Sequence, residues 1–261
     1  MPNSTRPKLV SLGKRLRKSS IACFGISPNW SDYPEEVRES ITAAEKIYYP
    51  GPTYESILTA SGKAIFPRNY YPLLGNKIIQ TELFQLLDVP HPRTRIYYGK
   101  EPSARILHDF GYPFVAKIPV GSSQGKGVFL ITARAGLAEY LASNNPAYIQ
   151  EFYPIERDLR VVLIGGRIVN AYWRIHRDGD FRNNVSQGGT IDFEDIPEAA
   201  LDFARSVALR CGFDEVGLDI CEYEGTYWVL EANMVFGLEG FREKGLDIHE
   251  ILANLAEEGA I

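Results

Sequence analysis

Histidine and cysteine, on which zinc sites and nucleophile–histidine catalysis depend, are scarce in this 261-residue chain, with four and three copies respectively. No Cys-x-x-Cys spacing occurs among Cys23, Cys211 and Cys221, which indicates buried free thiols in a reducing compartment rather than a disulfide framework or a zinc site. The histidines are scattered along the chain. The sequence therefore gives no basis for a zinc centre or a Ser-His-Asp triad.

Long hydrophobic runs are also missing. No segment reaches the roughly 18 apolar residues that a membrane span requires, and the N-terminus lacks the apolar core of a secretory signal. With 45% hydrophobic and 23% charged residues, the composition is that of an ordinary globular protein. We therefore expect a cytoplasmic protein of one large or two modest domains, with no membrane partner.

Acidic residues are absent from the first 31 positions, which hold six basic side chains. The net charge of the whole chain is −5, so the remainder carries −11. Such a basic arm either touches nucleic acid or another acidic surface, or is simply a solvated terminus. The acidic balance makes nucleic acid a poor candidate for the main partner. We expect residues 1–19 to form a flexible basic arm.

Apolar periodicity and turn residues predict a mixed α+β fold. Residues 20–75 contain two short strands and a helix beginning near Tyr33, and are expected to form a small α/β domain. Residues 76–261 are expected to form the main domain, divided into 76–150 and 151–261. The predicted strands and helices of the main domain are helix 76–87, strand 95–98, helix 103–110, strands 114–118 and 127–131, helix 135–142, strands 148–152, 160–164 and 168–174, helix 197–211, a hairpin over 216–233 and helix 247–257.

The predicted C-terminal hairpin carries three oxygen-bearing side chains: Asp219, Glu231 and Asn233. Glu231 and Asn233 are two residues apart, so they share one face of a strand. An odd-length loop such as Glu224-Gly225-Thr226 places Asp219 opposite Glu231, whereas an even loop does not. Two carboxylates and an amide on one face suit Mg²⁺ or Mn²⁺. The alternative is a sheet face that is merely exposed to water.

A glycine-rich segment, Gly121-Ser-Ser-Gln-Gly-Lys-Gly127, lies between two predicted strands. Its glycines free the backbone to turn N–H groups toward a phosphate. It is not a Walker A loop, because the spacing is short and Lys126 is followed by glycine, nor a Rossmann loop, because a strand follows it. Lys117 lies within the preceding apolar strand and needs an anionic partner there, unless it is a surface lysine whose head reaches water.

Three further segments carry polar groups that suit a nucleotide and an acid. Tyr148-Ile-Gln-Glu-Phe-Tyr153 offers main-chain groups and aromatic rings to a purine, and Asp158-Leu-Arg160 and Phe181-Arg-Asn-Asn184 add an acid and two arginines. Arginine is shaped for a bidentate grip on carboxylate or phosphate, although each of these can equally be a surface ion pair. Arg174, Arg177 and Arg182 are candidates for recognising a carboxylate.

In this combination the chain resembles the ATP-grasp superfamily, and within it the group of ribosomal protein S6 glutamate ligase, lysine-biosynthesis ligases and glutathione synthetase-like enzymes. The resemblance runs from about Asn76 to Gly240. The matching motifs are Asn76-Lys77, Val115-Ala-Lys117, Gly121 to Gly127, Gln150-Glu-Phe152, Asp158-Leu-Arg160, Arg182-Asn-Asn184, Gly217-Leu-Asp219, Glu231-Ala-Asn233 and Gly237-Leu-Glu-Gly240.

The resemblance implies an ATP-grasp fold, in which two α+β subdomains enclose ATP. It implies that Glu151 and Phe152 contact the adenine, Asp158 the ribose, and Lys77 and Lys117 the phosphates. The ATP-binding set is then Lys77, Lys117, Gly121, Ser122, Ser123, Gly125, Gly127, Gln150, Glu151, Phe152, Tyr153, Asp158 and Arg182. The metal ligands for one or two Mg²⁺ or Mn²⁺ ions are Asp219, Glu231 and Asn233, and the catalytic residues are Arg182, Asn184 and Arg160.

The implied reaction is ATP-dependent amide formation. A substrate carboxylate attacks the γ-phosphate to give an acyl phosphate, which an amine from a small molecule or peptide then attacks. The alternatives are a phosphotransferase and a non-catalytic ATP-binding module of the same fold. The chain is also compatible with a homo-oligomer. The chain departs from its relatives at Met234-Val235-Phe236-Gly237, where Phe236 is expected to reshape the wall beside the acyl group. The segment from Glu151 to Asp158 is also short.

Overall fold

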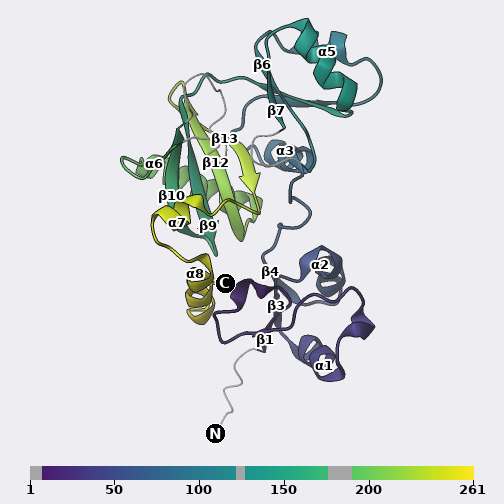
Figure 1. The fold of residues 1–261 in the computed structure, drawn as a ribbon, viewed down its shortest axis with the longest axis vertical. Helices are drawn as coiled ribbons and strands as arrows, with labels where there is room; N and C mark the ends of the chain where they lie inside the picture. Colours follow the sequence, from purple (N-terminus) through teal and green to yellow (C-terminus); the bar gives the residue numbers. More distant parts are fainter. Residues whose placement is uncertain (1–7, 122–126, 176–189) are drawn as a thin grey trace.

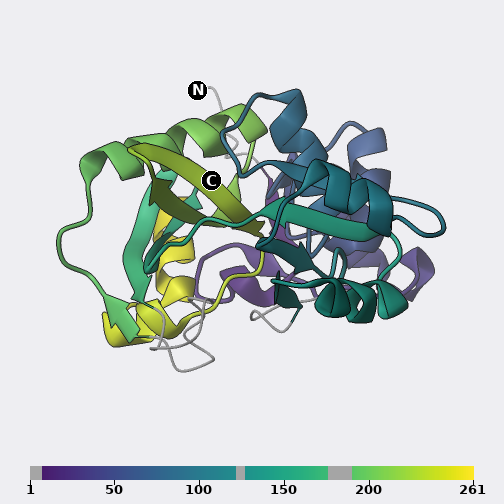
Figure 2. The ribbon, with the colours of Figure 1, turned by 90° about the horizontal axis from the view of Figure 1, so that it is seen from above.

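The computed structural model describes residues 8–121, 127–175 and 190–261, and the strands in these ranges form three sheets (Figure 1). The first sheet belongs to an N-terminal unit, and the other two lie next to each other at the opposite end of the molecule. Figure 2 shows these two sheets from above, with the C-terminal sheet on one side and the smaller, teal sheet on the other. Within the described ranges, no helix combines the length and apolar character needed to cross a membrane.

The N-terminal unit is a parallel sheet with strand order β2-β1-β3-β4. Parallel neighbours cannot be joined by a tight turn, so helices α1 and α2 provide the crossovers that lead into β3 and β4. The elements are β1 (Leu9–Ser11), η1 (Lys14–Leu16), β2 (Ala22–Cys23), η2 (Trp30–Asp32), α1 (Glu35–Ala43), β3 (Lys46–Tyr48), α2 (Gly51–Ala60) and β4 (Ala64–Phe66).

The expectation of a flexible arm over residues 1–19 is wrong for residues 9–16, while residues 1–7 lie outside the described part of the chain. Strand β1 pairs with both β2 and β3, and the Leu16 side chain in η1 is fully buried. Basic residues flank the short strand on both sides, so the strand is hard to recognise inside a basic stretch. Pairing of β1 within the sheet and burial of Leu16 in the core hold residues 9–16 in place.

The basic side chains near this strand bind carboxylates of the C-terminal part of the chain. Arg15 pairs with the buried Glu215, and Lys18 Nζ lies 2.7 Å from Asp247 Oδ2 and 2.8 Å from Glu250 Oε1. The predicted alternatives for the basic stretch were an external acidic partner or solvent. For Arg15 and Lys18 the partners are internal.

The second sheet is antiparallel, with strand order β5-β8-β6-β7, and two helices pack on it. Its core includes Phe114, Ile131, Leu137 and Ile149, all 3% exposed or less. Helix α3 connects the N-terminal unit to this sheet, and the Asn76 side chain caps it by accepting a hydrogen bond from the Ile79 N–H at 3.2 Å. The elements are α3 (Lys77–Leu86), β5 (Thr94–Tyr97), α4 (Ser103–Asp109), β6 (Phe114–Lys117), β7 (Val128–Ile131), α5 (Arg134–Ser143) and β8 (Ala147–Glu151).

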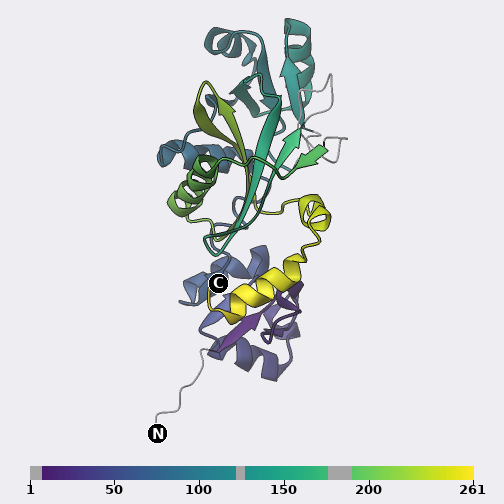
Figure 3. The ribbon, with the colours of Figure 1, turned by 90° about the vertical axis from the view of Figure 1, so that its left-hand side faces the viewer.

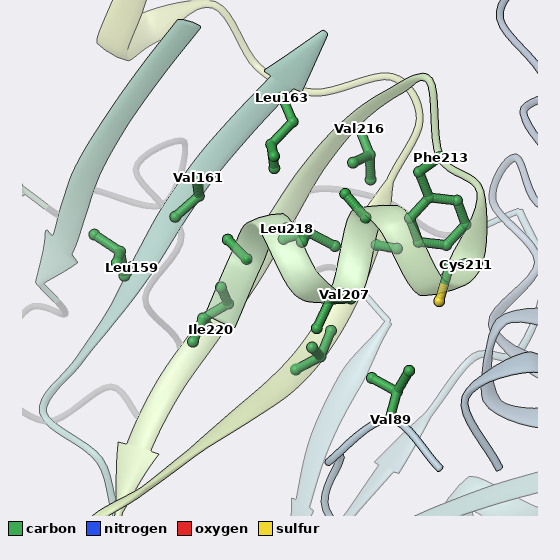
Figure 4. Close-up of a cluster of buried hydrophobic side chains, with 14 of the residues drawn as sticks. Val89, Leu159, Val161, Leu163, Val207, Cys211, Phe213, Val216, Leu218 and Ile220 are labelled. Carbon is green, nitrogen blue, oxygen red and sulfur yellow. The ribbon is translucent and has the colours of Figure 1, made fainter. Parts of the chain in front are cut away.

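The third sheet has strand order β11-β10-β9-β12-β13. Strand β9 is central and is buried from Asp158 to Ile164, because helix α6 covers one face of the sheet. Figure 4 shows Val207 and Cys211 of α6 in the same buried cluster as Val161 of β9 and Leu218 of β12. The elements are β9 (Arg157–Ile164), β10 (Arg167–Ile175), β11 (Thr190–Asp192), α6 (Glu198–Cys211), β12 (Glu215–Tyr223), β13 (Thr226–Asn233), α7 (Glu239–Glu243) and α8 (Ile248–Glu257).

A separate core joins the N-terminal unit to the C-terminal segment, and Figure 3 shows α8 lying along that unit. Leu16, Tyr48 and Phe66 of the N-terminal unit are in one buried cluster with Leu252 of α8 and Phe236. The Tyr48 hydroxyl also donates a hydrogen bond to the Ile261 carbonyl at 2.7 Å. Apolar burial on this scale holds the two parts as one packed body.

Candidate functional site

The hairpin of β12 and β13 brings Asp219 opposite Glu231, as the sequence predicts, but by a different route. The turn contains two residues, Glu224 and Gly225, with φ of +51° and +74°, as in a type I′ turn. The predicted three-residue loop is therefore wrong. An uninterrupted two-residue hairpin pairs Asp219 with Leu230.

A β-bulge corrects this register. Ile220 pairs with Val229, whereas Asp219 pairs with Glu231, so Leu230 is an extra residue in β13. Such an insertion changes which side chains face the neighbouring strand. The bulge therefore places Asp219 opposite Glu231, which is the pairing expected from an odd-length loop. The Leu230 carbonyl accepts a hydrogen bond from Lys117 Nζ at 3.4 Å.

The three predicted metal ligands come together on one face of this hairpin. Asn233 Nδ2 donates a hydrogen bond to Asp219 Oδ2 at 3.1 Å, and Glu231 lies opposite Asp219. Within the described ranges, no three His, Cys, Asp or Glu side chains form a self-contained metal cage. Two carboxylates and one amide oxygen nevertheless fit Mg²⁺, because that ion usually takes only one or two protein carboxylates and completes its shell with water and substrate phosphates.

Two buried lysines face these oxygens from the second sheet and α3. Lys77 Nζ lies 3.0 Å from Glu231 Oε1, and Lys117, in β6, is 7% exposed. Burial lowers the pKa of Lys117 to about 8, although the Glu231 carboxylate acts in the opposite direction. The alternative of a surface lysine is thus wrong for Lys117, and both ammonium groups are positioned for an anion.

The strands on either side of the glycine-rich segment, β6 and β7, pair antiparallel as expected, with Phe114 opposite Ile131 and Lys117 opposite Val128. Gly121 has a φ of +76°, which favours glycine, and its N–H donates to the Gly75 carbonyl at 3.0 Å. The Gly127 carbonyl accepts a hydrogen bond from the Ile118 N–H at 2.7 Å. The predicted phosphate-binding residues Ser122, Ser123 and Gly125 lie outside the described residues.

The predicted adenine segment covers the end of β8 and the two residues after it. Gln150 is buried, and its Nε2 donates to Thr94 Oγ1 at 2.9 Å, while Glu151 and Phe152 are half-buried. The Tyr153 ring stacks on Tyr223 with a centroid distance of 4.4 Å, which ties this segment to the tip of the β12–β13 hairpin. These four residues remain predictions as nucleotide contacts.

A small pocket between α3, β8 and β13 adds residues that the sequence analysis missed. Gln80 and Thr81 follow Lys77 by three and four positions, so they share its face of α3. Tyr148 precedes Gln150 by two positions in β8, which also indicates a common face. Helix and strand periodicity around the predicted residues could therefore have identified Gln80, Thr81 and Tyr148 as neighbours of the site. The pocket is lined by Lys77, Gln80, Thr81, Phe84, His91, Tyr148, Gln150, Val229, Leu230 and Glu231.

Asp158, predicted to contact the ribose, is buried in an ion pair. Arg174 Nε and Nη2 donate to its two carboxylate oxygens at 2.7 and 2.9 Å. Arg160, predicted to be catalytic, donates from Nε to Asp219 Oδ1. Burial acts to raise the pKa of Asp219, but the neighbouring Arg160 and Arg174 outweigh it and lower that pKa. The carboxylates that Arg174 binds thus belong to the protein itself.

The catalytic candidates Arg182 and Asn184, together with Arg177, lie outside the described residues. Phe236 is buried. Its side chain belongs to the core that joins the N-terminal unit to the C-terminal segment, where its ring lies 6.0 Å from that of Phe241. A Cβ at Gly217, which shares a strand face with Asp219, would lie 2.8 Å from Phe236 Cβ, so Phe236 lies on the same side of the sheet as Asp219. Its expected effect on the wall beside the acyl group stays a prediction.

Two facing sheets with cationic and carboxylate groups between them define a nucleotide-binding class of fold, and comparisons with known proteins agree. The RimK-like ATP-grasp domain model matches residues 75–255. The chain belongs to the RimK-like ATP-grasp family, and the predicted ATP-grasp fold of the α+β class is confirmed.

Among curated proteins, the chain is 32% identical to beta-citrylglutamate synthase B of Danio rerio over 176 residues, covering 64% of this chain and 43% of that protein. It is 27% identical to ribosomal protein bS6–L-glutamate ligase of Salmonella schwarzengrund over 236 residues, covering 79% of this chain and 78% of the relative. The first of these relatives is thus more than twice as long as the matched segment.

Among solved structures, the chain resembles the ATP-grasp ligase PsnB complexed with minimal precursor, Mg and ADP, with a TM-score of 0.65 and 17% identity. The match covers 97% of this chain and 98% of that structure. At this identity the likeness supports the fold alone.

Proposed function

We propose that this protein is an ATP-dependent carboxylate–amine ligase that forms an amide through an acyl phosphate. The observation that carries the proposal is the opposed arrangement of Lys77 and Lys117 and the oxygen-bearing face of Asp219, Glu231 and Asn233. Buried cations attract a polyphosphate, and hard oxygen donors suit the cation that accompanies it.

A Mg²⁺ ion held by Asp219, Glu231 and Asn233 would neutralise charge that spreads over the transferred phosphoryl oxygens. Lys77 and Lys117 would do the same from the opposite side, since they already lie in a low-dielectric environment where charge interactions are strong. The glycine-rich segment after β6 is proposed to cover the phosphates, because its glycines are expected to let the backbone turn N–H groups toward them.

In the first step, an oxygen of the substrate carboxylate attacks the γ-phosphorus of ATP, and ADP leaves. In the second step, the nitrogen of an amine attacks the acyl carbon, phosphate leaves with the bridging oxygen, and the nitrogen loses a proton. Arg182 and Asn184 are proposed to steady the γ-phosphate and the acyl group, and Arg160 to contribute positive charge from β9. Excluding water matters here, because water would otherwise hydrolyse the acyl phosphate.

Glutamate is the amine that we propose to test first. The names of both curated relatives describe products or reactions of glutamate, beta-citrylglutamate in one and a bS6–L-glutamate bond in the other. The carboxylate donor is proposed to be a small acid or a peptide.

The test is a screen of purified protein with Mg-ATP, L-glutamate and a panel of small acids and acidic peptides. The proposal predicts ADP release that requires both the acid and the amine, together with a new product whose mass fits an amide. A phosphorylated acid formed without any amine would instead support a phosphotransferase. ATP binding without turnover across the panel would support a non-catalytic module.

A further inference from the structure

Four buried charged residues form a cluster across three neighbouring strands of the third sheet. Arg174 of β10 faces Asp158 of β9, and Arg160 of β9 faces Asp219 of β12. Each of the four side chains is 8% exposed or less. We call Asp158, Arg160, Arg174 and Asp219 the charge cluster.

Within the charge cluster, Asp219 accepts hydrogen bonds on both carboxylate oxygens. Arg160 Nε donates to Oδ1, and Arg174 Nη2 lies 3.0 Å from Oδ2, which also accepts from Asn233. The neighbouring Glu231 is paired with Lys77 at 3.0 Å. Both carboxylates proposed to hold Mg²⁺ are therefore already compensated by cationic side chains.

The surroundings carry more positive than negative charge. Among the described residues, these ion pairs join three carboxylates and three cationic side chains. Lys117, which lies beside Glu231, is a fourth cation. Buried charges interact strongly because the local dielectric is low. A free divalent cation would therefore compete with arginine for Asp219 and be repelled by the excess positive charge. A nucleotide polyphosphate would be attracted by the same charge. The residues are Asp158, Asp219, Glu231, Lys77, Lys117, Arg160 and Arg174.

The two arginines differ in how firmly they are held. Arg174 makes a bidentate pair with Asp158, a geometry that fixes the guanidinium plane. Among the described residues, Asp219 is the carboxylate with which Arg160 pairs. Arg160 is thus the residue that can move to a phosphate oxygen, while Arg174 stays in place and keeps Asp219 oriented.

We infer that Arg160 and Arg174 prevent free divalent cations from binding to Asp219, so that the metal ion binds only together with the nucleotide. This inference rests on the proposed Mg–nucleotide site. In it, Arg174 is a positioning residue for Asp219, and Arg160 moves from Asp219 to the nucleotide phosphates.

The experiment uses Mn²⁺ as a probe and reads its binding to the protein through the relaxation rate of water protons. Wild-type protein is titrated with Mn²⁺ alone and with Mn²⁺ in the presence of ADP, and ADP binding without metal is measured by calorimetry. The expected result is at least tenfold weaker Mn²⁺ binding in the absence of ADP. Asp219→Asn should remove the ADP-dependent binding.

Variants of Arg160 test the cause. Arg160→Gln should raise the affinity of nucleotide-free protein for Mn²⁺ by about tenfold, Arg160→Lys should behave like wild type, and Arg205→Gln, at an exposed arginine of α6, should change nothing. If Arg160→Gln does not fold, the wild-type titrations decide alone. Equal Mn²⁺ affinity with and without ADP would overturn the inference and leave the ligase proposal standing, whereas absence of ADP binding would overturn both.

Discussion

Asp219 and Glu231 face each other across the β12–β13 hairpin because Leu230 adds one residue to β13. This relationship places both carboxylates on the face that looks toward Lys77 and Lys117. It explains how a two-residue turn is compatible with a two-carboxylate site, and it makes the hairpin the element on which the proposed chemistry depends.

Replacing Glu231 with glutamine should lower ATP turnover by about 100-fold or more, because the change removes a charge that the proposed metal ion requires. The fold should be unaffected, since Glu231 is only partly buried. Steady-state ADP release and circular dichroism check the two expectations. Glu222→Gln is the matched control, because Glu222 is an exposed carboxylate on the same hairpin. Wild-type turnover in Glu231→Gln would contradict the metal assignment.

The ammonium group of Lys117 should take up a proton when nucleotide binds near pH 8. Burial lowers its pKa from 10.5 to about 8 in the nucleotide-free protein, and a polyphosphate favours the charged form. Calorimetry of ADP binding at pH 8 to 9 in buffers of different ionisation enthalpy measures this uptake. Lys117→Met should abolish it. Equal apparent enthalpies in all buffers for the wild type would rule out the proton uptake.

The same pKa has a consequence for stability. Between pH 8 and 10.5 the unfolded chain binds more protons at Lys117 than the folded protein, so this residue makes the free energy of unfolding rise with pH in that window. Below pH 8 the Lys117 ammonium group is charged and desolvated in the folded protein, which lowers the free energy of unfolding. Lys117→Met should therefore be more stable than wild type at pH 7, and the difference should shrink by pH 10 in urea unfolding. A constant difference would contradict the lowered pKa.

Gly217→Ala should destabilise the protein by about 1–3 kcal/mol, the usual cost of overpacking a core. A Cβ at position 217 would lie 2.8 Å from Phe236 Cβ and 3.3 Å from Arg160 Cδ. Gly111→Ala is the control, because nothing lies within 4 Å of the equivalent Cβ. Urea unfolding of both variants measures the effect. Equal stability of the two would show that Phe236 can move without cost.

The contact between Tyr49 and Glu215 should stabilise the attachment of the N-terminal unit. The Tyr49 hydroxyl donates to the buried Glu215 Oε2 at 2.6 Å, so Tyr49→Phe leaves that carboxylate with one partner fewer. We expect a loss of about 1–3 kcal/mol in the free energy of unfolding. Tyr98→Phe, at an exposed tyrosine, should have no effect. A loss below about 0.5 kcal/mol for Tyr49→Phe would mean that Arg15 alone satisfies Glu215.

Local sequence signals predicted most of the elements correctly. The apolar periodicity of α3 and α6 and the turn residues between strands act over a few positions, so they can be read without the fold. Helix α2 is not among the elements predicted for residues 20–75, because Pro50-Gly51-Pro52 at its start is typical of a turn. Proline is also tolerated in the first turn of a helix, where it stands here.

The parts that escaped prediction depend on contacts between distant residues. The Leu230 bulge lies in β13, the edge strand of the sheet, and the length of the two-residue turn alone indicates another register. Arg174 was left without an assigned carboxylate, and its partners come from β9 and β12, 16 residues away in the case of Asp158. The packing of Phe236 against Phe241 also joins residues of separate segments, and a motif position alone does not show it.

The central claim is that a carboxylate is activated by phosphoryl transfer from ATP, and isotope transfer tests it most directly. The acid identified in the substrate screen is labelled with ¹⁸O in its carboxylate and incubated with Mg-ATP and the amine. The account predicts that each phosphate released with ADP carries one ¹⁸O atom and that the amide retains the other. Unlabelled phosphate, or formation of AMP and pyrophosphate, would contradict it.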